Sequence, residues 1–384
     1  MIDRNNRAPL SAIAGRTTSL RISRRYFLAG AAGLSLGATL GRITPAAAAG
    51  DVVFVGWEGY DTAFNDPEIL AKHGAKFQTT YINSIEDIIT KLHGGGIGSV
   101  DLTTFIHQYV SFAGAAGLLD PIDESKIPNL SKIHPHFSAF DDLLKVDGKR
   151  YAVPFTYSSI PLMYNPAVVK EAPTSWLDML KPEYKGKVAP YPDIMSMFVT
   201  WGRVANGTND PTHMTKAQLD KAIDMMIKLK ANSRTVPSSL GEISDMFIRG
   251  EIVMGMGWEP MVAWAKDKGV EIKIAHPKEG AFGYIDTVNI AKNAPNSDLD
   301  HELINQGIST AQQKTFAEAN LLGIVNAEAM KQIDNPLLKD LYSFDDPAVY
   351  FKHNPVPSMF PLQPENDYVV WDDVLAAYER YTRA

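Results

Sequence analysis

Aromatic and acidic residues fall in or near the ends of the runs that the sequence pattern predicts to be strands. The aromatic residues are Trp57, Tyr109, Tyr157, Trp258 and Tyr284, and the acids are Glu58, Asp193, Glu259 and Asp286. An aromatic face attracts an organic cation by about 0.5–2 kcal/mol, and a carboxylate adds charge-assisted hydrogen bonds. This set of residue types predicts a site for an organic ammonium ion.

The elements that must position these residues alternate between strands and helices, which predicts an α/β fold. Short apolar runs predict strands at 51–55, 77–81, 101–105, 252–256 and 271–275, and apolar residues at helical spacing predict helices over 85–92, 107–117, 216–229 and 238–249. Asp66 and Ser84 are expected N-caps of two helices. Because ligands of open α/β sheets bind beyond the carboxyl ends of strands, the polar residues that follow the strands are candidate ligand contacts.

Length and composition are those of a globular protein with about two domains. The chain has 384 residues, of which 45% are hydrophobic and 21% charged, and it has no cysteine. Disulfides, cysteine metal sites and cysteine nucleophiles are therefore excluded. No Gly/Ser-rich linker or internal repeat divides the sequence, so we expect two lobes joined by crossing strands.

The first 49 residues have the pattern of an export leader. Ser23-Arg24-Arg25-Tyr26-Phe27-Leu28 resembles a twin-arginine signal, and a Gly/Ala-rich apolar run and four alanines ending at Ala49 follow it. We expect 1–49 to be a signal peptide cleaved near Ala49, which predicts a periplasmic protein. The net charge is −7 and becomes more negative without the Arg-rich leader, which argues against binding to nucleic acid or anionic membrane.

One long spaced pattern carries a resemblance to a known family. The stretch Pro173-x-Ser175-Trp-x-Asp-x-Leu-x-Pro-x-Tyr-Lys-Gly-Lys-Val188 resembles the signature of periplasmic solute-binding proteins of the spermidine/putrescine type, which serve ABC importers. Within the same stretch, Ser175 is an expected N-cap and Pro182 ends the short helix. Further matches follow the family order, namely Trp57 after the first strand, Gly250-Glu251-x-x-Met254 before Trp258, 277–280, and Asp286-x-x-x-Ile290.

The resemblance implies the two-lobed type 2 periplasmic binding fold. Each lobe would be a mainly parallel sheet flanked by helices, and two strands would cross between the lobes near Tyr157 and Asp286. The implied first lobe is 51–156 plus 287–384, and the implied second lobe is 157–286.

The resemblance also assigns roles to individual residues. Trp57, Trp258 and Asp286 match family positions that contact the amine, Tyr284 replaces a family tryptophan, and Asp193 lies in the loop that holds one amine. Three positions depart from the family, since Ser196 stands where a companion acid is expected and His107 and Gln108 replace small hydroxyl and tyrosine residues. The expected ligand-binding residues are Trp57, Glu58, His107, Gln108, Tyr157, Asp193, Ser196, Trp258, Glu259, Tyr284 and Asp286.

These departures leave two ligand classes open. One is a polyamine such as putrescine or spermidine, and the other is an amino-acid-like amine of the gamma-aminobutyrate, betaine or opine type, whose carboxylate could meet Arg203. In either case we expect a monomer that works with an inner-membrane ABC permease, without a cofactor, a metal ion or catalytic residues. A weaker option is a receptor whose closed form docks on a signalling partner.

A secreted hydrolase is the remaining alternative. His93-Gly94-Gly95-Gly96 resembles the oxyanion-hole motif of lipases, but the Gly-x-Ser-x-Gly pattern occurs only at 33–37, inside the leader. A glycine-rich helix stop is the simpler interpretation of 94–96. His134-Pro135-His136 has no carboxylate in helical register, which argues against a metal site there.

Overall fold

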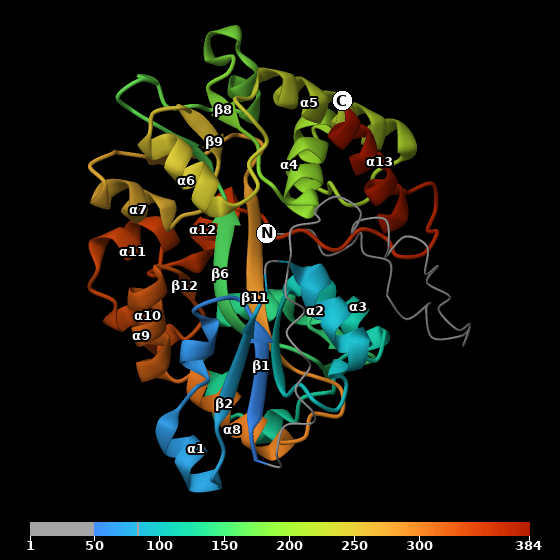
Figure 1. The fold of residues 1–384 in the computed structure, drawn as a ribbon, viewed down its shortest axis with the longest axis vertical. Helices are drawn as coiled ribbons and strands as arrows, with labels where there is room; N and C mark the ends of the chain where they lie inside the picture. The colour runs from blue at the N-terminus through green and yellow to red at the C-terminus, as the bar shows by residue number, and fades with distance from the viewer. Residues whose placement is uncertain (1–49, 83) are drawn as a thin grey trace, which may run out of the picture. The chain divides into compact units, whose positions relative to one another are not determined.

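Two long strands connect two sheets of different size. The computed structural model describes residues 50–384 apart from Asn83, and the predicted export leader lies outside the described residues. The first sheet has six strands in the order β12-β6-β11-β3-β1-β2, and the second has four in the order β10-β7-β9-β8. Figure 1 shows β6 and β11 running side by side from one sheet toward the other. The two-lobed α/β fold is confirmed.

The strands of the first sheet are β1 (Val52–Gly56), β2 (Phe77–Tyr81), β3 (Leu102–Ile106), β6 (Val153–Ile160), β11 (Phe282–Ile290) and β12 (Gly323–Ile324). Those of the second are β7 (Leu162–Tyr164), β8 (Val188–Ala189), β9 (Met254–Met256) and β10 (Lys273–Ala275), and β4 (Lys145–Val146) and β5 (Lys149–Arg150) form a separate hairpin. The helices are α1 (Pro67–His73), α2 (Ile85–Lys91), α3 (His107–Ala115), α4 (Ile194–Asn206), α5 (Lys216–Asn232), α6 (Leu240–Ile248), α7 (Met261–Asp267), α8 (Ser297–Gly307), α9 (Thr310–Asn320), α10 (Ala327–Gln332), α11 (Pro336–Tyr342), α12 (Pro347–His353) and α13 (Trp371–Arg383).

Strand direction differs from the expectation of mainly parallel sheets. The pairs β1–β2, β1–β3 and β8–β9 are parallel, whereas β11 pairs antiparallel with both β3 and β6, and β7 pairs antiparallel with β9 and β10. The reason is the crossing itself. Since β6 leaves the first lobe and β11 returns to it, the two adjacent crossing strands must run in opposite directions.

Local sequence explains where several helices begin. The side chain of Asp66 accepts hydrogen bonds from the backbone of Glu68 and Ile69 at the start of α1. Ser84 and Asp87 form a capping box at the start of α2. Ser175 and Asp178 form another before the short 3-10 helix at Trp176–Leu180. The N-caps predicted at Asp66, Ser84 and Ser175 are confirmed.

The first sheet is covered on both faces. Phe54 and Val55 of β1 point to opposite faces, as successive strand residues must, and they belong to two separate hydrophobic cores. The core around Val55 includes residues of α2 and α3 and continues into the second lobe. The core around Phe54 includes residues of α8, α9, α10, α11 and α12.

The last helix packs on the second lobe, although the resemblance implies that 287–384 belong to the first lobe. Helix α13 packs against α5 and α4, and Arg380 of α13 pairs with Asp220 of α5 through N–O contact at 2.5 Å. The Nζ atom of Lys230 also donates to the carbonyls of Tyr381 and Thr382. Figure 1 shows α13 beside these helices. The C-terminal segment therefore crosses back to the helices of the second lobe, and sequence order alone gave no sign of this.

Candidate ligand-binding site

Two tryptophans lie where the two cores meet. Trp57 follows β1 and Trp258 follows β9, and both are half-buried. Each of them packs against both hydrophobic cores. The indole nitrogen of Trp258 has no hydrogen-bond partner. The structure thus brings Trp57 and Trp258, which are 201 positions apart in the sequence, to the boundary between the two cores.

Asp286 on β11 is the best-defined acidic group of the candidate site. Its side chain is 3% exposed. The hydroxyl of Tyr60 donates to Oδ2 at 2.6 Å, whereas Oδ1 is buried without a partner. Burial raises the pKa of Asp286 to about 7, and the Tyr60 hydrogen bond opposes this shift. A cationic nitrogen is the natural partner for the unpaired oxygen, since charge-assisted hydrogen bonds are the strongest available there.

Further tyrosines surround Asp286. The pKa of Tyr284 is raised well above its usual value by burial and by the charges of Asp286, Tyr191 and Glu259. The pKa of Tyr191 is raised by burial and then by the charge of Asp193, with Glu259 and Asp286 contributing less. Tyr191 therefore lies close enough to both Asp193 and Asp286 to feel their charges, and these two carboxylates share one neighbourhood.

Asp193 caps α4. Its Oδ1 accepts hydrogen bonds from the backbone nitrogen of Ser196 at 2.7 Å and from the Ser196 hydroxyl at 2.6 Å. Asp193 is solvent-exposed, yet the surrounding protein atoms raise its carboxyl pKa, while the hydrogen bonds lower it. Ser196 is buried and supports Asp193 rather than presenting a free hydroxyl.

Sequence reasoning missed Glu86 in the first turn of α2. Glu86 is exposed, and its pKa is raised by the surrounding protein and by the charge of Asp193. The pKa of Tyr109, on α3, is raised by burial and then by the charges of Glu86 and Asp193. The charge of an acid in α2 of the first lobe is thus felt together with that of the N-cap of α4 in the second lobe. The signal available in the sequence was the position of Glu86 just after the N-cap Ser84.

Tyr60 was also missed, although it stands three residues after Trp57 in the same loop. It begins a 3-10 helix, Tyr60–Ala63, and is 5% exposed. Its ring packs edge-on against Phe155 and Phe316, with ring centroids 5.5 Å away in each case. These contacts fix the hydroxyl that orients Asp286.

Two of the expected ligand contacts are turned away from any open space. Tyr157 on β6 is fully buried among aromatic residues, and its hydroxyl donates to the carbonyl of Tyr342 at 2.7 Å. His107 is also fully buried, because its Nε2 bonds the carbonyl of Pro357 at 2.8 Å and its Nδ1 accepts from the backbone nitrogen of Ile285 at 3.3 Å. Burial lowers the pKa of His107 to about 4. Both side chains connect segments of the fold and offer no polar atom to a ligand.

Gln108 and Glu58 lie in contrasting surroundings. Gln108 is 1% exposed, its Nε2 donates to the carbonyl of Ser358 at 3.3 Å, and its Oε1 is buried without a partner. Glu58 is exposed; the pKa of Tyr81 at the end of β2 is raised chiefly by the charge of Asp61, and the charge of Glu58 adds a smaller contribution. Gln108 therefore has a free acceptor, while Glu58 lies in the exposed loop that follows β1.

Glu259 was expected to contact the ligand, but the protein itself occupies its carboxylate. The side chain is 1% exposed and accepts hydrogen bonds from Ser158, Ser159 and Tyr350. Arg203, considered as a partner for a ligand carboxylate, is 3% exposed and donates to the carbonyl of Ala281 at 3.2 Å. Both carboxylate oxygens of Glu259 are therefore occupied, and one guanidinium nitrogen of Arg203 is held by the backbone of Ala281.

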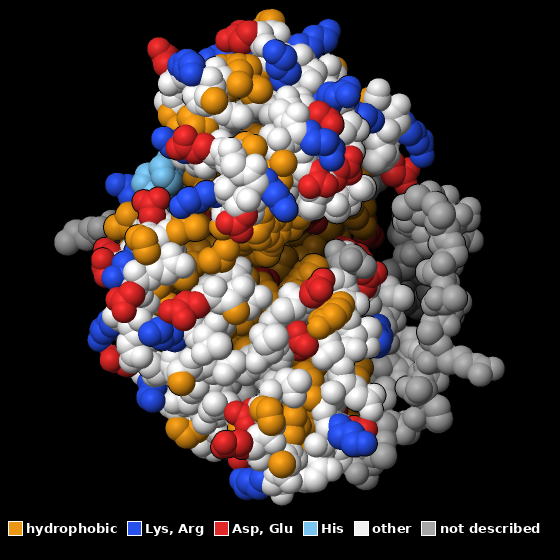
Figure 2. Space-filling view, turned by 60° about the vertical axis from the view of Figure 1, so that its left-hand side comes forward, with side chains coloured by type: hydrophobic (Ala, Val, Ile, Leu, Met, Phe, Trp, Pro, Cys, Tyr) orange, Lys and Arg blue, Asp and Glu red, His pale blue; other side chains and the backbone are white. Residues whose placement is uncertain are grey.

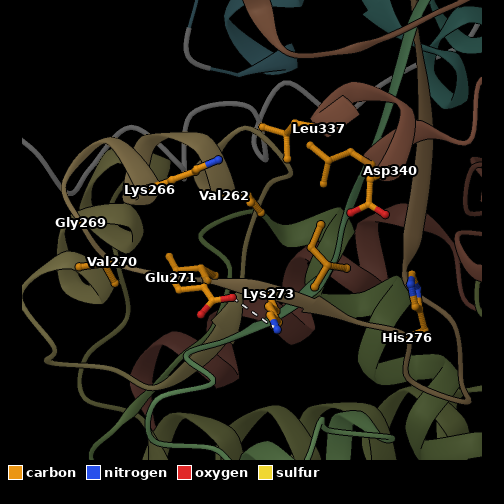
Figure 3. Close-up of a pocket in the computed structure, with 12 residues that line it drawn as sticks. Val262, Lys266, Gly269, Val270, Glu271, Lys273, His276, Leu337 and Asp340 are labelled. Atoms are coloured by element: carbon orange, nitrogen blue, oxygen red, sulfur yellow. Dashed lines mark ion pairs between the residues drawn. The ribbon is translucent and has the colours of Figure 1, made fainter. Parts of the chain in front are cut away.

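A hollow separates the two lobes on one face of the molecule. Figure 2 shows that hydrophobic side chains form most of its walls, with acidic side chains at its edges. Part of the space between the lobes is a cavity of about 760 Å³ between α7 and β10 on one side and α11 on the other. Lys266, Lys273, His276 and Asp340 line it, and Figure 3 shows the ion pair of Lys273 with Glu271. None of the eleven expected ligand contacts lines this cavity, so it is distinct from the candidate site.

No group of three or more His, Asp or Glu side chains within 50–82 and 84–384 is arranged to hold a metal ion. No helix in this described part of the chain is long and apolar enough to cross a membrane.

Comparisons with known proteins place the chain in a family. Residues 60–341 match the family of bacterial extracellular solute-binding proteins. The chain is 28% identical over 343 residues to spermidine/putrescine-binding periplasmic protein 1 of Haemophilus influenzae, covering 87% of this chain and 89% of that protein. It is 26% identical over 299 residues to the spermidine/putrescine-binding periplasmic protein of Escherichia coli, covering 76% of this chain and 82% of that protein.

A solved structure shares the fold. The substrate-binding protein of a spermidine/putrescine ABC transporter from Streptococcus pneumoniae superimposes with a TM-score of 0.68, over 87% of this chain and 98% of that one. Sequence identity in this alignment is 22%. At that level the likeness concerns the architecture of two lobes around a cleft, and the ligand must be argued from the residues of this chain.

Proposed function

Because the chain belongs to the family of bacterial extracellular solute-binding proteins, we propose that it captures a small organic amine between its lobes and delivers it to an inner-membrane ABC permease. The preferred ligand class is a polyamine such as putrescine or spermidine. The observation that carries the proposal is Asp286, a buried carboxylate with one oxygen held by Tyr60 and the other without a partner.

The site suits an ammonium group in two ways. The unpaired Oδ1 of Asp286 would accept a charge-assisted hydrogen bond, which is worth about 1.5–3 kcal/mol. Trp57, Trp258 and Tyr284 would supply aromatic faces, each worth about 0.5–2 kcal/mol to a cation. Asp193 would take a second amine at the other end of the ligand, and Gln108 would contribute its free acceptor oxygen.

Binding rather than turnover is the proposed activity. Ligand contacts made by both lobes would stabilise a closed arrangement, which the permease would recognise. We propose that the protein acts as a monomer in the periplasm, without a catalytic step. The twin-arginine leader would direct its export to the periplasm and would be cleaved near Ala49. The lobes would be 51–156 plus most of 287–384, and 157–286, with α13 packed on the second lobe.

An amino-acid-like amine is the second candidate. It is favoured by Ser196, which stands where the resemblance implies a second acid and which bonds to Asp193 instead. A ligand with one amine would need only Asp286. Glu86 weighs against this alternative, because it places another carboxylate near Asp193.

A thermal-shift screen of the mature chain tests the proposal. A ligand that binds only the folded state raises Tm by mass action. At a ligand concentration of about 100 times Kd, the free energy of unfolding increases by about 2.7 kcal/mol. We expect putrescine or spermidine to give the largest shift, with gamma-aminobutyrate, betaine and opines as competitors and sugars as controls. A shift caused only by anions or sugars would refute the amine proposal, and esterase or amidase turnover would favour the hydrolase.

A further inference from the structure

Glu259 has no cationic partner, although it is almost completely buried. Its Oε1 accepts hydrogen bonds from the Ser159 hydroxyl at 2.5 Å and the Tyr350 hydroxyl at 2.6 Å, and its Oε2 accepts from the Ser158 hydroxyl at 2.6 Å and the Ser159 backbone nitrogen at 3.2 Å. No ion pair among the described side chains includes it. A buried charge of this kind is tolerated only when hydrogen bonds satisfy it.

The four donors come from parts of the chain far from Glu259 in sequence. Ser158 and Ser159 lie near the C-terminal end of the crossing strand β6, and Tyr350 lies on α12, whose residues belong to a core of the first lobe. Glu259 itself follows β9 of the second lobe. One carboxylate therefore ties together the crossing strand, a helix of the first lobe and a loop of the second.

The Tyr350 end of this network is firmly held. The ring of Tyr350 lies edge-on to Tyr157 with centroids 5.0 Å apart, and it also packs against Tyr342 at 5.8 Å and Phe351 at 5.2 Å. Because these rings are buried, the hydroxyl has little freedom to follow Glu259 if the loop moves. Tyr350 therefore holds the carboxylate of Glu259 against a core of the first lobe.

The residue just before Glu259 is Trp258, one of the two tryptophans at the boundary of the cores. Trp258 is half-buried and its indole nitrogen is unpaired, so its ring is fixed by packing alone. The ring of Trp264, on α7, is 5.7 Å from that of Trp258 and is itself exposed. The backbone that carries the ring is held on one side by Gly257, whose nitrogen donates to the carbonyl of Pro161 at 3.0 Å, and on the other by the hydrogen bonds of Glu259 to β6 and α12.

We propose that Glu259 is a positioning residue, which anchors the Trp258 loop to β6 and α12 so that the aromatic wall of the ligand site is formed before the ligand arrives. Preorganisation of this kind improves affinity because the ordering cost is met during folding. The part of this inference that concerns affinity rests on the proposed function, whereas the part that concerns the position of Trp258 does not.

The test uses the mature chain labelled with 5-fluorotryptophan and observed by fluorine NMR without ligand. Trp258→Phe assigns the Trp258 resonance. In Glu259→Gln, the amide keeps one acceptor oxygen and places an NH2 group against hydroxyl donors, so we expect the Trp258 resonance to shift or broaden. Tyr350→Phe removes one donor and should cause a smaller change in the same resonance. Ser158→Ala is the further variant if Glu259→Gln does not fold.

A matched control is Glu279→Gln. Glu279 also accepts from a serine hydroxyl, that of Ser175 at 2.5 Å, and from the backbone nitrogen of Trp176 at 3.3 Å. This control should disturb the resonance of Trp176 and leave that of Trp258 in place. A Trp258 resonance unchanged in Glu259→Gln, Tyr350→Phe and Ser158→Ala would overturn the proposal.

Titration with putrescine and spermidine adds the affinity readout. If Glu259 acts by positioning, Kd should rise about tenfold in Glu259→Gln and less in Tyr350→Phe. If Glu259 instead bound the amine directly, Tyr350→Phe would free an acceptor oxygen and tighten binding, and that result would overturn the proposal. Absence of amine binding in the unaltered protein would refute the proposed function and leave the Trp258 measurement as the test of the inference.

Discussion

The Tyr60 hydroxyl donates a 2.6 Å hydrogen bond to Oδ2 of Asp286, and the two residues are 226 positions apart in the chain. The hydrogen bond joins the loop after the first strand to the middle of β11. It satisfies one oxygen of a buried carboxylate and leaves the other unpaired. The unpaired oxygen favours the binding of either a proton or a cation, and this has three testable consequences.

Asp286→Asn should have opposite effects on ligand affinity and on the stability of the ligand-free protein. Loss of one charge-assisted hydrogen bond should raise the Kd for putrescine or spermidine about tenfold or more. Without ligand, the neutral amide avoids the cost of burying a carboxylate, so Tm at pH 8 should rise. Calorimetric titration and thermal unfolding measure the two effects, and unchanged affinity would remove Asp286 from the site.

Amine affinity should depend on pH with a midpoint near 7. The pKa of Asp286 is raised to about 7 in the folded protein, compared with about 3.9 for an unfolded aspartate. The carboxyl is therefore protonated below pH 7, and Kd should rise about tenfold for each unit below that value while the amine stays charged. Above about pH 8 the Kd should become constant.

The same shift predicts how stability changes with pH. Because folding raises the pKa, the folded state binds the proton more tightly, so Asp286 lowers the stability of the ligand-free protein progressively from about pH 4 to 7. Asp286→Asn should flatten both the affinity profile and this contribution to stability. A profile that stays steep in the variant would assign the titration to another group.

Glu86→Gln should discriminate between ligands with one amine and those with two. If Glu86 and Asp193 hold the second amine between them, the Kd for putrescine should rise about threefold to tenfold while that for a monoamine changes little. Glu183→Gln, at an exposed acid of the second lobe, is the matched control. Equal effects of both variants would mean that only long-range charge is involved.

Gly283→Ala should destabilise the crossing strand. A Cβ at Gly283 would lie 2.0 Å from the carbonyl oxygen of Asn354, which is backbone and cannot move aside as a side chain would. Overpacking of this kind costs about 1–3 kcal/mol. Gly94→Ala is the control, since nothing lies within 4 Å of its Cβ position. Thermal or urea unfolding that gives equal stabilities for both variants would contradict this close approach.

The positions of several strands, helices and helix starts could be predicted from the sequence, because interactions between residues close in the chain determine them. Apolar runs and helical spacing located β1, β2, β3, α3 and α5, and the N-caps Asp66, Ser84 and Ser175 fixed where helices or turns begin. These features depend on interactions within a few residues, so the sequence contains them directly. The resemblance to the solute-binding family rested on the same kind of local pattern, and the family match over residues 60–341 confirmed it.

The orientation of side chains across the fold was decided only by the tertiary structure. Tyr157 and Glu259 have the right chemistry for a ligand site. Strand alternation, however, points the Tyr157 side chain into a hydrophobic core, and hydroxyl donors on β6 and α12 occupy the carboxylate of Glu259. Glu86 entered the neighbourhood of Asp193 only because α2 and α4 approach each other from different lobes. A sequence specifies which groups are available, whereas burial and long-range pairing decide which of them remain free to bind a ligand.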